Sequence, residues 1–153
     1  MTEMSSFCDA LPRQDFGSQV DPMLEQGLAL IAEERFDAAV SVLSEAARLN
    51  PASAEAWNSY GAALQQLGRH QDAVERHLKA IEIDPAFAEA HNNLGVALSA
   101  LGQYGAAFDA FDRAASLDSD NIEAAENRVA VLRALNAHVS GAAQGRNGAR
   151  QLA

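Results

Sequence analysis

The sequence predicts an all-α fold built from stacked helical hairpins, and three observations support this. Shifting the 153-residue chain by 34 residues superimposes small and apolar residues on one another, among them Gly27, Gly61 and Gly95 and also Leu30, Leu64 and Leu98. Within each unit, apolar residues recur at spacings of three and four, which is typical of helices with one buried face. The chain is 48% hydrophobic, and it lacks the alternating β-branched runs of strands. A 34-residue period of this kind indicates helix-turn-helix units.

Residues 1–19 precede the first unit, and their mixed, polar composition predicts a flexible arm. The single cysteine, Cys8, cannot form an internal disulfide, and the first residues lack the basic end and apolar run of a signal peptide. These features favour the cytoplasm. No stretch is long and apolar enough to suggest a membrane span.

Three units follow, at residues 20–53, 54–87 and 88–121. The second is the most regular. Its first helix is expected to end at Gly68, because glycine adopts the left-handed conformation that terminates helices, and its second at Asp84-Pro85, because proline cannot continue a helix. Small residues at Gly61 and Ala73 allow the two helices to cross closely.

Residues 122–138 repeat only the first helix of a unit, which predicts a helix that caps the stack. The remaining residues, 139–153, are glycine-rich and aperiodic, so we expect them to be disordered.

These motifs resemble those of the tetratricopeptide repeat family over residues 20–138. The resemblance implies a right-handed α-solenoid of three repeats and a C-terminal capping helix, with a concave groove that binds a peptide or helix of a partner protein. We therefore expect a non-catalytic adaptor without a cofactor. No phosphate-binding loop, nucleophile elbow or metalloprotease motif occurs in the sequence.

The family geometry implies which residues line the groove. The candidates are Leu24, Leu28, Ile31, Asn58, Gln65, Asn92, Asn93, Val96 and Asn127. The asparagines resemble the ladder in the repeat superhelix of O-GlcNAc transferases, and their amides could clamp the backbone of a peptide. The three apolar residues of the first helix could anchor a partner helix or a second copy of the chain, or be covered within their own molecule.

The net charge of −10 disfavours nucleic acid and favours a basic or neutral protein partner. Relatives that bind chaperone C-terminal carboxylates use lysine and arginine in the groove, but the corresponding positions here hold Leu24, Leu28, Ser59, Glu89 and Asn93. A cationic clamp for an acidic peptide end is therefore not expected.

A series of acids, Asp21, Glu55, Glu89 and Glu123, recurs every 34 residues. Acids in a first turn complement the helix N-terminus, and they could also form a negative line along the groove edge. His70, His77 and His91 lack a carboxylate or cysteine at ligand spacing, so we expect structural histidines rather than a metal site. Two alternatives to an adaptor remain: a structural protein that self-assembles through its apolar end, and an accessory subunit of an enzyme such as a glycosyltransferase.

Overall fold

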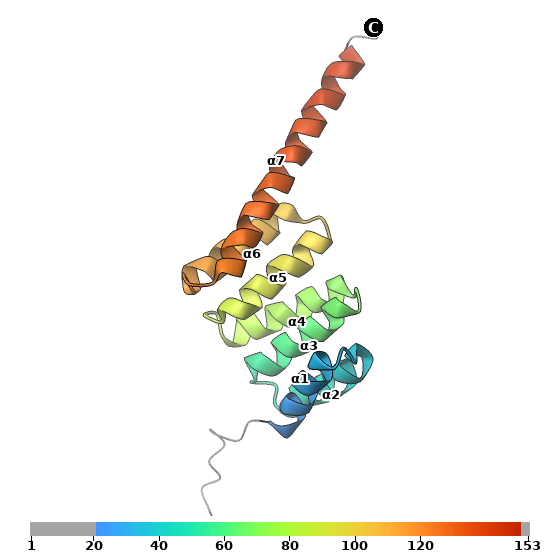
Figure 1. Ribbon diagram of the computed structural model, residues 1–153, viewed down its shortest axis with the longest axis vertical. Coiled ribbons are helices and arrows are strands. Elements are labelled where there is room, and N and C mark those ends of the chain that lie inside the picture. The colour runs from blue at the N-terminus through green and yellow to red at the C-terminus, as the bar shows by residue number, and fades with distance from the viewer. Residues whose placement is uncertain (1–20, 151–153) are drawn as a thin grey trace, which may run out of the picture.

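The computed structural model describes the backbone of residues 21–150 and the side chains of residues 21–142. This part of the chain forms seven helices and no strand, which confirms the all-α prediction (Figure 1). The helices are α1 (Pro22–Ala32), α2 (Phe36–Leu49), α3 (Ala54–Gln66), α4 (His70–Ile83), α5 (Ala88–Ala100), α6 (Tyr104–Leu117) and α7 (Ile122–Arg150). The predicted arm, residues 1–19, lies outside the described residues.

The helices form three hairpins, α1–α2, α3–α4 and α5–α6, stacked in chain order with α7 against α5 and α6 (Figure 1). The second helix of each hairpin also packs on the first helix of the next, and α1, α3, α5 and α7 contact one another in sequence. A hairpin alone cannot bury its apolar faces, so the core is completed by stacking.

The turn inside each hairpin has the same geometry in all three repeats. Glu34, Gly68 and Gly102 occupy it with φ of 58°, 73° and 74°. In the second repeat the N–H of Arg69 donates to the Leu64 carbonyl at 3.0 Å. Backbone bonds between residues with the same separation in the sequence close the other two turns. These bonds satisfy carbonyls that the helix end leaves free.

Close helix crossing inside each hairpin depends on a glycine of the first helix. Leu43, His77 and Phe111, from the second helices, pack on Gly27, Gly61 and Gly95. A Cβ added at Gly61 would lie 2.7 Å from His77 Cε1, and one at Gly95 would lie 2.6 Å from Phe111 Cε1. Any larger residue there would force the helices apart.

Helix α7 is longer than the predicted capping helix. Instead of ending at residue 138, it continues to Arg150, so the prediction that residues 139–153 are disordered is wrong for residues 139–150 (Figure 1). The segment contains no proline, and a helix that is already nucleated can continue through Gly141, Gly145 and Gly148 at a cost of about 1 kcal/mol each.

In the part of the chain that the structure describes, no helix could cross a bilayer.

Candidate functional site

A ladder of side-chain hydrogen bonds joins the first helices of successive repeats. Asn58 Nδ2 on α3 donates to Glu89 Oε1 on α5 at 2.8 Å, and Asn92 Nδ2 on α5 donates to Glu123 Oε1 on α7 at 3.3 Å. Both bonds span 31 residues, so one geometry is repeated along the stack. Two of the acids predicted to lie in first turns, Glu89 and Glu123, therefore also hold the preceding repeat, whereas Asp21 is the N-cap residue of α1 and not in its first turn.

A second set of bonds runs in the opposite direction along the chain. Asn93 Nδ2 donates to Asn58 Oδ1 at 3.2 Å, and Asn127 Nδ2 donates to Asn92 Oδ1 at 3.3 Å. Asn58 and Asn92 are only 1% and 4% exposed. The predicted role of these two asparagines in clamping a peptide is therefore wrong, because their amides already bond within the protein.

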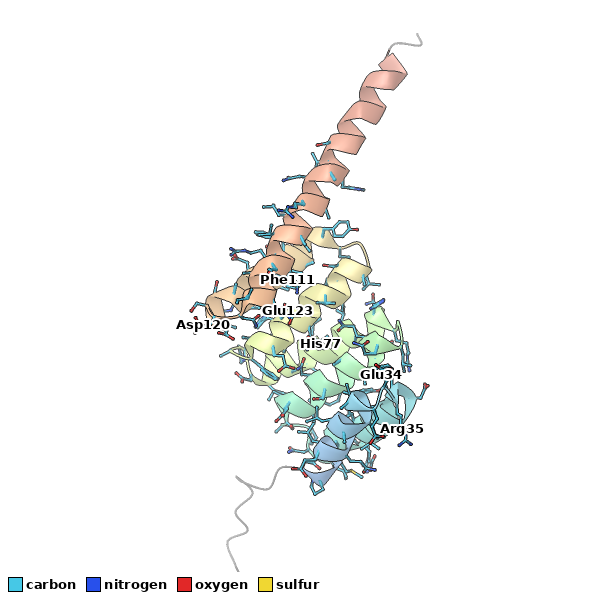
Figure 2. The ribbon with its side chains drawn as sticks, viewed as in Figure 1. Glu34, Arg35, His77, Phe111, Asp120 and Glu123 are labelled. Atoms are coloured by element: carbon cyan, nitrogen blue, oxygen red, sulfur yellow. The ribbon has the colours of Figure 1, made fainter. Side chains whose placement is uncertain are left out.

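His77 extends the ladder into the core of the second hairpin (Figure 2). Burial lowers the pKa of the His77 imidazole to about 4, so the ring is neutral at pH 7. The Asn58 amide is oriented by its bond to Glu89, so His77 Nδ1 carries the proton and donates to Asn58 Oδ1 at 2.9 Å. Nε2, 2.9 Å from Gln65 Oε1, can then only accept, and the Gln65 amide must turn its NH2 group toward it.

The predicted apolar anchor on α1 is only partly present. Leu24 is 3% exposed and belongs to the core, as do Asn58 and Asn92 at the same position of the next repeats. Ile31 is partly buried against that core, whereas Leu28 is 40% exposed. The expectation of three groove-facing apolar residues is therefore wrong for Leu24, because this position points between neighbouring first helices.

Two hollows lie along the first helices of the repeats. One, of about 470 Å³, is lined by Leu28, Ser53, Ala54, Glu55, Asp84, Phe87 and Glu89. The other, of about 240 Å³, is lined by Val96, Ser99, Phe111, Asn127, Ala130, Val131 and Ala134. Three predicted groove residues, Leu28, Val96 and Asn127, thus line hollows, and Asn93 is half-buried.

The larger hollow is acidic. Glu55, Asp84 and Glu89 surround it, and none of them forms an ion pair with another described residue. The sequence predicts Glu55 and Glu89 as first-turn acids that could also line the groove edge, but it does not predict the contribution of Asp84 and Phe87, which belong to the turn between repeats. The asparagine-to-glutamate spacing of 31 was the available signal for the ladder.

The other candidate chemistry has local structural explanations. His91 Nε2 lies 3.0 Å from the Pro85 carbonyl oxygen. In the previous repeat, Trp57 Nε1 donates to the Pro51 carbonyl, and these two residues have the same separation in the sequence. Among the residues that the structure describes, no three histidine, cysteine or acidic residues gather as a metal site would require.

Comparisons with known proteins identify the repeat. A family model described as TPR repeat matches residues 27–68 and 61–102, and one described as tetratricopeptide repeat matches residues 88–121. No curated protein matches the sequence.

Several solved structures share the fold. The Sgt2 TPR domain from Aspergillus fumigatus is 22% identical with a TM-score of 0.76, over 80% of this chain and 82% of that one. The Arabidopsis OM64 TPR domain is 29% identical with a TM-score of 0.69, over 71% and 90%. The first TPR of Spaghetti (RPAP3), bound to the HSP90 peptide SRMEEVD, is 19% identical with a TM-score of 0.73, over 74% and 90%.

Proposed function

Because the chain belongs to the tetratricopeptide repeat family, we propose that it is a non-catalytic adaptor that holds a segment of a partner protein against α1, α3, α5 and α7. The observation that carries the proposal is the acidic hollow between α1, α3 and the turn before α5. It combines carboxylates that form no ion pair with another described residue and accessible apolar side chains, which suits a ligand that offers both charge and an apolar anchor.

The charge of this hollow selects the class of partner. Glu55, Asp84 and Glu89 line one space, so a lysine or arginine placed there would be surrounded by negative charge. The RPAP3 structure holds an acidic peptide, SRMEEVD. An acidic peptide would be repelled here, and we expect the opposite preference.

Apolar contacts would complement the charge. Leu28 and Phe87 line the acidic hollow, and Val96 and Ala130 line the second one. A basic segment with an apolar residue beside its cation fits the first hollow. Asn127, whose carbonyl oxygen has no hydrogen-bond partner among the described residues, can accept a backbone N–H from the same segment at the second hollow.

The experiment is a binding titration with a fluorescent basic peptide that carries one leucine, compared with SRMEEVD. We expect saturable binding of the basic peptide only, weakening as salt is added. The double variant Glu55→Gln and Glu89→Gln should lower the affinity about tenfold, from two lost charge contacts.

The matched control is the double variant Glu75→Gln and Glu82→Gln. It changes the net charge equally, but both residues lie on α4, outside the two hollows. If the two double variants lost affinity equally, the loss would come from the change in overall charge, and the assigned site would be refuted. Preference for SRMEEVD would refute the basic partner.

A further inference from the structure

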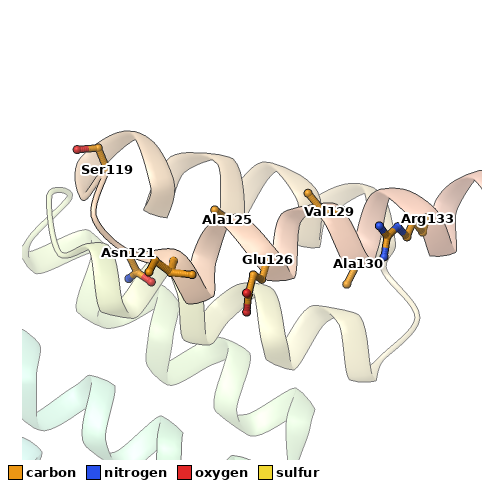
Figure 3. Close-up of a pocket in the computed structure, with 8 residues that line it drawn as sticks. Ser119, Asn121, Ala125, Glu126, Val129, Ala130 and Arg133 are labelled. Atoms are coloured by element: carbon orange, nitrogen blue, oxygen red, sulfur yellow. The ribbon is translucent and has the colours of Figure 1, made fainter.

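Helix α7 carries a row of exposed apolar side chains along one face. The described part of the chain has eight large hydrophobic side chains that are exposed, and four of them lie on α7: Ile122 at 72%, Val129 at 44%, Leu132 at 43% and Val139 at 62%. In the three hairpins, the corresponding face of the first helix is covered by the second helix. A shallow hollow of about 600 Å³ lies here (Figure 3).

The face has the spacing of a coiled-coil seam. Steps of three and four residues connect Ile122, Ala125, Val129, Leu132, Asn136 and Val139. Ala125 and Val129 project from the same side of the helix in Figure 3. A seven-residue repeat of this kind, apolar at every position except Asn136, favours packing against another long helix, with side chains of each inserted between those of the other.

The opposite face of α7 fixes the helix to the solenoid. Ala124 and Val131 are buried there, and Arg128 Nη1 donates to Asp112 Oδ1 of α6 at 2.7 Å. The apolar face therefore points away from its own molecule. Its helix is already formed, so a partner would bind without having to order it, and the entropic cost is lower.

Val129 shows that the missing partner is not the second helix of a fourth repeat. It stands in register with Gly61 and Gly95, where an added Cβ would lie within 2.7 Å of the packed ring. The branched side chain of valine excludes such close crossing. The geometry requires a helix that packs at the wider spacing of a coiled coil.

We propose that α7 pairs with α7 of a second copy of this chain, in antiparallel orientation about a twofold axis between Val129 and Leu132. In that register Val129 faces Leu132 of the second copy, and Ile122 faces its Val139. Ala125 leaves room for Asn136. The same surface serves both copies, as a twofold interface requires.

Charge decides the orientation. Glu126 and Arg133 flank the seam on one side, and neither forms an ion pair with another described residue. In the antiparallel pair, Glu126 of each copy lies near Arg133 of the other, which gives two attractive contacts. A parallel pair would instead bring Arg133 near Arg128 of the second copy, which is repulsive.

The first test measures molecular mass by sedimentation equilibrium over a range of concentrations, on the full chain. We expect a monomer-dimer equilibrium for the wild type and a monomer for Val129→Glu. The control is Leu49→Glu, at a side chain 58% exposed on α2, which should still dimerise. A wild type that stays monomeric throughout would overturn the proposal.

The second test exchanges the charges and does not depend on the apolar variant folding well. Glu126→Arg and Arg133→Glu should each raise the dimer dissociation constant about tenfold, because both contacts become repulsive. An equimolar mixture of the two variants should form a heterodimer with wild-type affinity, since every contact again joins opposite charges. A mixture that dimerises no more tightly than the separate variants would overturn the pairing. So would a dimer that is lost when residues 1–20 are removed but whose dissociation constant does not change with these charge substitutions.

Discussion

At the scale of single residues, Glu34 adopts a backbone conformation that its counterparts Gly68 and Gly102 reach without strain. Its φ of 58° brings a Cβ close to the following carbonyl. We expect Glu34→Gly to raise the free energy of unfolding by about 1 kcal/mol, measured by urea denaturation. Glu33→Gly, at φ −83°, is the control and should not stabilise the protein. Stabilisation by both variants would mean that charge removal, not the turn, is responsible.

His77 gives a pH-dependent prediction at the same scale. Its pKa is about 4 in the folded protein and near 6.5 in the unfolded chain. Because the folded value is the lower one, the stability from this residue is complete above pH 6.5 and falls as the pH drops toward 4, by up to about 3 kcal/mol.

The variant that tests this effect is His77→Leu, which copies Leu43 of the first repeat. Its free energy of unfolding, measured in urea at a series of pH values, should fall less steeply than that of the wild type between pH 6.5 and 4. His138→Ala, at an exposed position of α7, should keep the wild-type slope. Identical slopes for His77→Leu and the wild type would show that His77 is not the group responsible.

At the scale of elements, α7 is held by one face only. Val131 is 6% exposed in the core, whereas Val139 is 62% exposed. Val131→Ala should therefore cost about 2 kcal/mol of unfolding free energy, from lost burial and the cavity left behind. Val139→Ala should cost almost nothing at concentrations where the chain is monomeric. Thermal melts of the two variants at low concentration compare these losses. Equal losses of stability would show that the face of α7 that packs on the solenoid has been assigned wrongly.

At the scale of the whole molecule, each hairpin is stabilised by its neighbours, so the ends should open first. Helix α1 has no repeat before it among the described residues, while α3, α4 and α5 are packed from both sides. Native-state hydrogen exchange should show the strongest protection in α3 to α5 and weaker protection in α1. Equal protection of all helices would indicate one cooperative unit and contradict this picture.

Much of this architecture could be predicted from the sequence because the 34-residue register fixes both helix ends and crossing points. Gly68 marks a helix end, because it adopts a positive φ, and Gly61 marks a crossing point, because there is no space for a Cβ there. The extent of α7 could not be predicted in this way. Whether a glycine-rich segment continues a helix depends on what precedes it, not on its composition alone.

The candidate groove was harder to predict than the fold, for a physical reason. Asn58 and Asn93 are both polar and close in the register, yet Asn58 is buried and Asn93 half-buried. The period of the sequence repeat alone does not reveal which amide points between two helices and which points into the groove. Leu24 shows the same limit, since an apolar residue at the position of Asn58 is also buried.

Val129 also limits how this solenoid can lengthen in evolution. A duplicated 34-residue unit inserted before Ile122 would bring its own glycine and its own second helix, and α7 would still close the stack. A unit added after α7 would meet a valine where close crossing needs a glycine. Longer relatives of this chain should therefore have gained their extra repeats internally, with the terminal helix carried along unchanged.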